Sequence, residues 1–428
     1  RVERSPSVVQ IELSPRKMLS HCFAQGDWMK KEMSDSIGRL LIFVNPNSGY
    51  MKGVKTFHDK VEPELRRKNI DFELIITDGA DHAKNIVETR EDLADFNAIL
   101  ILSGDGLVFE VLNGIFNRRD HWELLHVLPI GIVPSGSGNG LLSSVFASRK
   151  FPLKNPAFTN KAIELVTSAT CLAQPVNLIH AQTRDANYAA FLSVGWGLMA
   201  DIDVESERWR KSLGSNRFVL GALIRCCNLR TYRGRLSYRE HSLSDDSAHS
   251  PFAVFGRTAA EKLRDCTCNK PGTSRRNRSE SATTRRNEDI WLTAHSIEGI
   301  PPIDEAIPEE GWTVIEDEFV GVYAMAASHI ANDGPMQPRA LLDDERIYLS
   351  FIRKRDLPSR ASLIKMLIAL EKGDHLKMNF LKWVDVSSFR LESLTPGKGR
   401  IVLDGETIGA DSIQVTVSNY RTAIISDL

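Results

Sequence analysis

The chain has 428 residues, of which 42% are hydrophobic and 25% are charged, a composition typical of a soluble globular protein long enough for two domains. Its 54 lysines and arginines nearly balance 55 aspartates and glutamates, so no overall positive field favours nucleic acid as a partner. Six cysteines without paired CxxC spacing argue against a zinc module or a secreted disulfide framework, and no apolar run is long enough for a membrane span, so we expect a cytoplasmic protein.

Residues 1–37 are mixed and aperiodic, and we expect them to form a loose N-terminal extension. Residues 38–155 then alternate short apolar runs with amphipathic patterns, beginning with LLIFVNPNSG and ending with IGIVPSGSGN and GLLSSVFA. This βαβα order predicts an α/β domain with a mostly parallel sheet and helices on both of its faces.

Residues 156–428 change to strand-like stretches such as YAAFLSVGWG and SIQVTVS, with helical patterns near 204–229 and 359–371. We expect a second domain there, an antiparallel β-sandwich-like fold with helices. Within it, residues 241–310 are predicted to be a largely disordered insertion, because stretches such as PGTSRRNRSE contain too few aliphatic side chains to offset the entropy of ordering.

Three glycine-containing turns each follow an apolar run of the first domain, namely NPNSG (45–49), SGDG (103–106) and PSGSGNG (134–140). Such turns at the carboxyl ends of parallel strands line the crevice where α/β proteins bind ligands. We expect Gly136 and Gly138 to adopt positive φ and let the backbone approach a phosphate, which amides at the next helix start would bind. Neither GxxxxGK[ST] nor a complete GxGxxG is present, which excludes a P-loop and a Rossmann site.

Four motifs identify the chain as similar to the diacylglycerol kinase-type lipid kinases, and within them to the sphingosine kinases. They are SGDGLVFEVLNG, PSGSGNGLLSS, WGLMADIDVESERWRKSLGSNRFVLGAL with RTYRGRLSY, and LDGETI. The resemblance covers roughly residues 39–240 and 313–420. It implies a phosphofructokinase-like first domain, a cleft between the two domains, and transfer of the γ-phosphoryl of ATP, with Mg²⁺, to a lipid hydroxyl.

By this resemblance Asp105 of SGDG is the catalytic aspartate, which takes the proton of the lipid's primary hydroxyl. A carboxylate held in a tight glycine turn reaches an incoming oxygen without a long, flexible side chain. The alternative is that Asp105 caps the first turn of the helix that follows it.

The resemblance also implies the nucleotide contacts. They are Asn45, Pro46, Asn47, Ser48, Gly49, Thr77, His82, Gly104, Gly106, Glu110, Gly136, Ser137, Gly138, Asn139, Glu207, Arg210, Arg217, Gly405 and Glu406. Arg210 and Arg217 match phosphate-clamping arginines, whose planar guanidinium suits phosphate oxygens. Glu207 lies one helical turn before Arg210, and an ordinary surface ion pair between them is the alternative. The first turn departs from the relatives' common NPxGGxGxA at Ser48 and Tyr50.

Asp404 and Glu406 of LDGETI match acidic residues that support Mg²⁺ in the family. Carboxylates at positions i and i+2 point to the same side of a strand, which suits a hard, oxygen-bound cation. A β-turn at DGE is the alternative.

The resemblance assigns substrate contacts to Ser103, Asp105, Asp203, Phe218, Leu367 and Met378. Asp203 matches the acidic residue that faces the amino group and hydroxyl of the sphingoid base in sphingosine kinases, where ceramide kinases tend to have an apolar residue; Asp201 is the alternative for this role. Phe218, Leu367 and Met378 are candidates for the wall of a groove for the lipid chain, although such residues are as readily ordinary core.

The sequence therefore predicts a kinase of sphingosine or a related sphingoid base that produces sphingosine 1-phosphate. A ceramide or diacylglycerol kinase, and a catalytically weak signalling scaffold, are the alternatives. Basic stretches such as RKRDLPSR (353–360) favour peripheral recruitment to a membrane surface. A homodimer, and a regulatory kinase acting on serines of the insertion, are further partner predictions.

Overall fold

The computed structural model describes residues 38–51, 53–136, 138–214, 216–241, 252–253, 300–332 and 334–427. The predicted extension at 1–37, most of the predicted insertion, and Ser137 lie outside the described residues.

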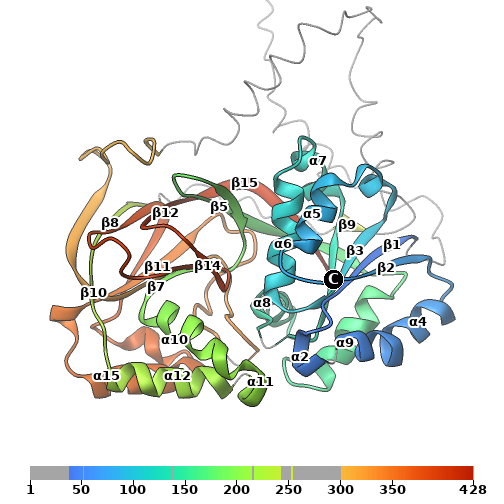
Figure 1. Ribbon diagram of the computed structural model, residues 1–428, viewed down its shortest axis with the longest axis horizontal. Coiled ribbons are helices and arrows are strands. Elements are labelled where there is room, and N and C mark those ends of the chain that lie inside the picture. Colours follow the sequence, from blue (N-terminus) through green and yellow to red (C-terminus); the bar gives the residue numbers. More distant parts are fainter. Residues whose placement is uncertain are drawn as a thin grey trace, which may run out of the picture.

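The first part is an α/β unit whose parallel strands lie in the order β2-β1-β3-β4. β1, β3 and β4 are buried at every position because helices cover both faces of the sheet, with α5, α6 and α7 on one side and α4 and α9 on the other (Figure 1). The strands are β1 (Leu40–Val44), β2 (Phe72–Ile76), β3 (Ala98–Ser103) and β4 (Ile130–Pro134). The helices are α2 (Ser48–Met51), α3 (Gly53–Thr56), α4 (Glu62–Arg67), α5 (His82–Thr89), α6 (Asp105–Phe116), α7 (His121–Val127), α8 (Gly140–Ser148) and α9 (Ala157–Val166). The predicted fold class of this part is confirmed.

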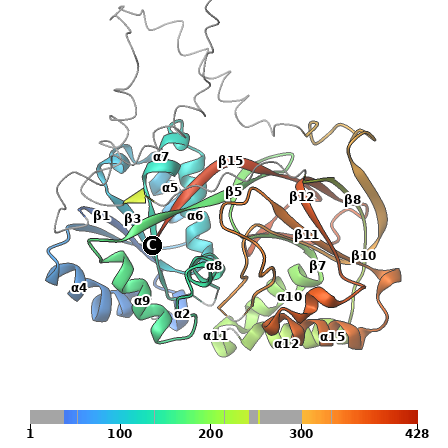
Figure 2. The same cartoon turned by 180° about the vertical axis from the view of Figure 1, so that it is seen from behind.

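The second part is built from antiparallel strands, as predicted, and helices gather along one side of them (Figures 1 and 2). The strands are β5 (Leu172–Gln182), β6 (Asn187–Ala190), β7 (Ser193–Gly197), β8 (Tyr232–Glu240), β9 (Phe252–Ala253), β10 (Thr313–Met325), β11 (Ile347–Arg353), β12 (Lys382–Ser393), β13 (Ile401–Leu403), β14 (Glu406–Ile408) and β15 (Ser412–Ser426). The helices are α10 (Leu198–Ser206), α11 (Arg210–Leu213), α12 (Asn216–Cys227) and α15 (Arg360–Ala369).

The last strand connects the two parts. β15 pairs with β12 near its start, runs antiparallel to β5 along most of its length, and reaches β4 through the parallel pair Ile424 and Ile130. The described strands therefore form one continuous hydrogen-bonded sheet, and the chain ends beside the parallel strands (Figure 2).

The described end of the predicted insertion, residues 300–310, is held by a buried arginine. Arg390 is 1% exposed and donates to the carbonyls of Glu305, Pro301 and Pro302 at 2.5, 2.7 and 3.0 Å. Because a buried guanidinium needs acceptors for its N–H groups, these contacts fix the segment in place.

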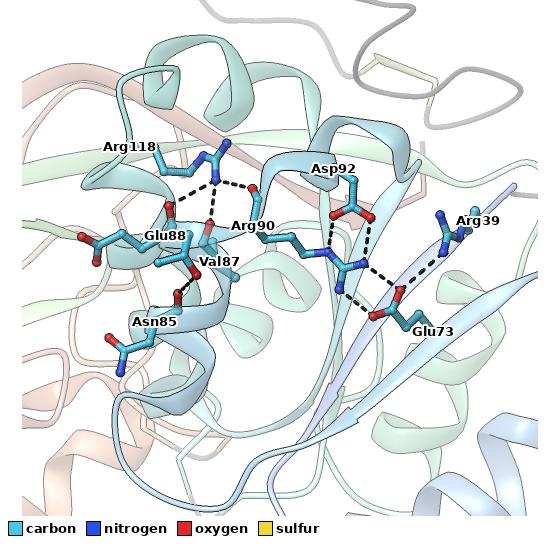
Figure 3. A network of polar contacts seen from close by, with 9 residues as sticks. Arg39, Glu73, Asn85, Val87, Glu88, Arg90, Asp92 and Arg118 are labelled. Carbon is cyan, nitrogen blue, oxygen red and sulfur yellow. Dashed lines mark hydrogen bonds and ion pairs between the residues drawn. The ribbon is translucent and has the colours of Figure 1, made fainter.

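The position of α5 is set by two arginines at its C-terminal end (Figure 3). Arg118 donates to the carbonyls of Val87, Glu88 and Arg90 at 2.9, 3.3 and 2.6 Å, which satisfies acceptors that a helix end leaves open. Arg90 in turn makes a bidentate contact with Glu73 of β2 at 2.6 and 2.7 Å. The opposite end of α5 faces the candidate site.

Two large apolar cores and one small cluster, of Ile300 and Trp312 with Ile307, are present in the described residues. The larger core fills both sides of the parallel sheet and the inner face of the antiparallel strands. The smaller core lies between β10, β11 and the helices α10, α12 and α15, and includes Leu198, Ile202, Val320, Ile352, Leu363 and Met366. Among the described helices, none combines the length and apolar character needed to cross a bilayer.

Candidate active site

The three predicted turns converge at one edge of the parallel sheet, where β1, β3 and β4 end. Ser48 of the first turn lies between Ser103 and Ser135 of the other two, with Oγ–Oγ distances of 3.5 and 3.4 Å. These hydroxyl groups give the edge a set of neutral donors and acceptors of the kind that bind phosphate oxygens.

The glycines allow the turns to contact one another directly. A Cβ atom on Gly104 would lie 2.4 Å from the carbonyl oxygen of Gly138, and one on Gly136 would lie 2.7 Å from Cα of Gly104. Gly49 has φ +55°, and a Cβ there would overlap the carbonyl oxygen of Ser135. The prediction of positive φ at Gly136 and Gly138 is wrong: among the glycines of the three turns that the structure describes, only Gly49 adopts it. Gly104 and Gly136 instead use the missing side chain for close packing between the turns.

Asp105 begins α6, but its carboxylate caps a different helix. Its oxygens accept hydrogen bonds from the amides of Gly140 and Leu141, the first residues of α8, at 2.7 and 3.2 Å. The alternative that Asp105 caps its own helix is therefore wrong. Burial, opposed by these two amide bonds, raises the pKa of Asp105 from 3.8 to about 6, so the carboxylate can both hold and release a proton near neutral pH.

Glu110 lies five residues after Asp105 on α6, and its carboxylate accepts hydrogen bonds from amides at the start of α5. Burial and the charge of Asp81 raise its pKa from 4.5 to about 7, while hydrogen bonds from the amides of Ala83 and Asp81 lower it. Two carboxylates of one helix thus face the N-termini of α8 and α5, the ends that bind anions.

The remaining predicted residues of the first part lie at the same edge. Asn45 Oδ1 accepts a hydrogen bond from the amide of Asn47 at 2.9 Å, which shapes the turn that contains Pro46. Thr77 follows β2, and its amide donates to Val44 O at 2.9 Å, while His82 begins α5. Asn139 precedes α8 and donates to Gly136 O at 3.1 Å.

Asp404 and Gly405 form a two-residue hairpin turn between β13 and β14, with φ +51° and +90°. The expectation that Asp404 and Glu406 share one side of a strand is therefore wrong, because residues 404 and 405 form the turn itself. The Asp404 carboxylate is 2% exposed and accepts three main-chain hydrogen bonds at 2.9 Å, from Phe191, Leu192 and Ser193. Burial raises the pKa of Asp404 to about 7, against these bonds, and its carboxylate orients the start of β7.

Glu406 follows that turn and is exposed. A Cβ atom on Gly106 would lie 2.7 Å from Glu406 Oε1, so this carboxylate stands over the first turn of α6, beside Asp105. Residues of the two parts of the chain meet at this point. No group of three or more histidine, cysteine or acidic side chains within the described ranges forms a ready-made metal site.

Asp203 of α10, Glu207 just after that helix, and Arg217 of α12 form a charged group that faces the hairpin turn. Arg217 is 3% exposed and pairs with Glu207 at 3.1 Å and with Asp203 at 3.4 Å. Asp203 Oδ2 lies 3.9 Å from the Cβ position of Gly405. Arg210 belongs to α11, but its side chain lies outside what the structure describes, as does the whole of Ser137.

Asp201 faces away from this group. It accepts a hydrogen bond from the Tyr232 hydroxyl at 2.6 Å and lines a cavity of about 440 Å³ together with Arg230, Thr231 and residues 397–400. None of these lining residues belongs to the group around Asp105, so the geometry favours Asp203 over Asp201 for contact with a substrate bound there.

The three predicted apolar candidates lie together. Phe218, Leu367 and Met378 are half-buried and pack against the smaller apolar core. That core extends from the outer helices toward α10, which carries Asp203.

Sequence reasoning missed two residues of the site, Ser193 and Tyr323. The Tyr323 hydroxyl donates to Ser193 Oγ at 3.0 Å. Burial raises the pKa of Tyr323, and the carboxylates of Asp203, Asp404 and Asp105 raise it further. No sequence signal could have found this pair, because it depends on the register between β7 and β10.

Comparisons with known proteins agree with the geometry. The model of the diacylglycerol kinase catalytic domain matches residues 39–172. Sphingosine kinase 1 of Caenorhabditis elegans is 43% identical over 91% of this chain and 81% of its own length, and human sphingosine kinase 1 is 32% identical over 89% of both.

Among solved structures, a Bacillus anthracis protein described as a diacylglycerol kinase superposes with a TM-score of 0.57 at 17% identity, covering 92% of this chain and 98% of that one. At this identity the superposition speaks for the fold alone. The identity to the curated relatives goes further, and it shows that the chain belongs to the sphingosine kinase family of diacylglycerol kinase-type lipid kinases.

Proposed function

We propose that this ATP-dependent lipid kinase transfers the γ-phosphoryl group of ATP to the primary hydroxyl of sphingosine or a related sphingoid base, giving sphingosine 1-phosphate. The observation that carries the proposal is the buried Asp105 carboxylate, which lies where the glycine turns of the first part meet Glu406 of the second. The names of the relatives support the same substrate class.

Asp105 acts as the general base. With a pKa of about 6 it is mostly ionised at neutral pH, yet basic enough to accept the proton of an alcohol as the oxygen attacks phosphorus. The phosphates of ATP would lie against the three turns and the N-terminus of α8, where amides and hydroxyl groups offset their charge. Arg217 and Arg210, which belong to the second part of the chain, would contribute permanent positive charge next to these phosphates.

Mg²⁺ fits this site through Glu406. Magnesium in phosphoryl-transfer enzymes is commonly held by one or two carboxylates together with substrate phosphates, and it neutralises phosphate charge. Glu406 is exposed beside Asp105, whereas both oxygens of Asp404 already accept main-chain hydrogen bonds. We therefore assign the metal contact to Glu406 and a positioning role to Asp404.

Asp203→Asn is expected to raise the KM for sphingosine about tenfold, since a charge-assisted hydrogen bond to the substrate's ammonium group contributes about 1.5 kcal/mol or more. Activity toward ceramide or diacylglycerol, which carry no ammonium group, should not fall. The measurement is a panel of sphingosine, dihydrosphingosine, ceramide and diacylglycerol with labelled ATP under identical conditions.

Glu205→Gln is the matched control, because Glu205 lies on the same helix and pairs with Arg225 at 3.0 Å and Arg230 at 2.8 Å, away from the hairpin turn. It should leave the KM for sphingosine unchanged. A panel in which the parent prefers ceramide or diacylglycerol would replace the proposed substrate, and a parent without turnover on any lipid would favour the signalling scaffold.

Peripheral membrane binding is a second part of the proposal, and apolar side chains support it better than the predicted basic stretch. Arg353, Lys354 and Arg355 of that stretch pair with Asp356, Glu318 and Asp317 at 2.6, 2.9 and 2.9 Å. In contrast, Leu223 on α12 and Ile368 on α15 are 47% and 72% exposed. Both helices cover the smaller apolar core, which extends to α10. A lipid substrate that leaves a bilayer at this face could therefore reach Asp203 along this core.

The double variant Leu223→Glu with Ile368→Glu is expected to weaken binding to phosphatidylcholine–phosphatidylserine vesicles at least about tenfold, because it removes two apolar side chains from contact with the bilayer. Co-sedimentation measures the binding. Val314→Glu, at a residue that is 48% exposed on β10, is the control. Equal vesicle binding by all three proteins would contradict the assignment of this face.

A homodimer, and phosphorylation of the insertion by a regulatory kinase, stay predictions. The arginine-flanked serines that suggested phosphorylation lie outside the described residues.

A further inference from the structure

The ring of Tyr323, a residue of β10, packs over the neighbouring strand β7. In the register of β10 with β7, Tyr323 is opposite Gly195, and a Cβ atom on Gly195 would lie 3.0 and 3.1 Å from Cε2 and Cδ2 of the tyrosine ring. A Cβ atom at 195 would be in tight contact with the ring, which would have to shift slightly. The glycine opposite Tyr323 therefore lets the ring pack closely against β7.

The hydroxyl group of Tyr323 ends beside the reacting region. It donates to Ser193 Oγ, and the main chain of Ser193 is fixed by Asp404 through two hydrogen bonds of 2.9 Å, one from Ser193 N to Oδ1 and one from Asp404 N to Ser193 O. Because neighbouring carboxylates and burial raise its pKa, the phenol stays neutral and can both donate and accept a hydrogen bond.

The same face of the sheet leads from Tyr323 into the smaller apolar core. Gly321 lies two residues before Tyr323 and pairs with Ile352, which belongs to that core. Side chains at i and i+2 of a strand share a face, so Tyr323, which packs against the larger core, lies on the same face as Ile352 of the smaller one. A half-buried polar group at this boundary is where the chain of a bound lipid would begin.

We propose that Tyr323 contacts the substrate and recognises the hydroxyl group on carbon 3 of a sphingoid base, an inference that rests on the proposed function. In such a base, carbons 1, 2 and 3 carry a hydroxyl, an amino group and a second hydroxyl. With the first at Asp105 and the second at Asp203, the third can meet the uncharged pair of Tyr323 and Ser193, which is joined to Asp404.

The test combines Tyr323→Phe with removal of the same contact from the substrate. The parent and the variant are assayed on sphinganine and on 3-deoxysphinganine, which lacks the hydroxyl on carbon 3. The variant is expected to lose about five- to tenfold in kcat/KM on sphinganine, as for one neutral hydrogen bond, and to match the parent on the 3-deoxy base. The KM for ATP should not change.

Tyr348→Phe is the matched control, since Tyr348 lies on the neighbouring strand β11 and its buried hydroxyl also donates to one side chain, at Asp344 Oδ2. This control should lower kcat/KM on both bases equally or leave it unchanged on both. An equal loss on both bases in Tyr323→Phe would leave Tyr323 with a packing role and overturn the proposal, and so would no loss on either. A parent that phosphorylates neither base, but does phosphorylate ceramide or diacylglycerol, would instead overturn the proposed function and this inference with it.

Discussion

Replacing Asp105 with asparagine is expected to lower kcat on sphingosine by about a thousandfold, since a positioned general base contributes about 10²–10⁴-fold to the rate. Asparagine has nearly the same shape, but its single oxygen can keep only one of the two bonds, such as the 2.7 Å bond from Gly140, and its NH2 group then replaces the acceptor of the 3.2 Å bond from Leu141. The variant therefore removes the base together with one of the two capping bonds of α8. Steady-state rates with labelled ATP, together with the melting temperature, measure the two effects.

Asp344→Asn provides the control for loss of a buried charge. Asp344 is 6% exposed, compared with 8% for Asp105, and burial raises the pKa of its carboxylate too, but its hydrogen bonds come from Leu341 N and Tyr348, neither of which belongs to the three turns. This control should keep the parent's kcat. If Asp105→Asn also stays within about tenfold of the parent, capping of α8 is the whole role of Asp105.

The pH dependence of the parent provides a second measurement on Asp105. The base works in its ionised form, and its pKa is raised from 3.8 to about 6, so kcat/KM should fall as pH decreases through about 6, roughly tenfold for each further unit. A base with an ordinary pKa would instead keep its rate down to pH 4. Asp105→Asn should remove this acid limb from what activity remains.

The fold could be predicted because its signals are local. Buried parallel strands are continuous apolar runs, as in LLIFV at 40–44, and each is followed by a turn and an amphipathic helix. Because parallel strands end at one edge, the meeting of Ser48, Ser103 and Ser135 also follows from chain order alone.

The partners of the site's side chains could not be predicted, because they come from distant segments. Asp105 caps a helix that begins 35 residues later, and Asp404 holds amides more than 200 residues earlier. The sequence suggested that Asp404 and Glu406 lie on one strand. Asp404 and Gly405 instead adopt positive φ, so they form the turn of a hairpin. Tyr323 enters the site only through the register of β10, which short-range patterns do not contain.

Gly104→Ala is expected to lower kcat/KM by about a hundredfold, the size of effect produced by a 1 Å displacement of catalytic groups. The backbone at Gly104 is extended, with φ −108° and ψ −166°, a conformation open to alanine, so the effect comes only from the new methyl group. That group would lie 2.4 Å from the carbonyl oxygen of Gly138, and main chain cannot rotate away as a side chain can. The second and third turns must separate, which also breaks the 3.3 Å hydrogen bond from Asp105 N to Gly138 O.

Separation of the turns should weaken ATP binding and catalysis together, because the phosphate-facing turn and the general base move apart. Gly409→Ala is the matched control: it adds the same methyl group in an exposed loop where nothing lies within 4 Å of the new atom. The measurements are KM for ATP, kcat and the melting temperature of both variants. Parent-like kinetics in Gly104→Ala would mean that contact between these two turns is not what assembles the site, and the catalytic centre would then have to be sought elsewhere than at Asp105.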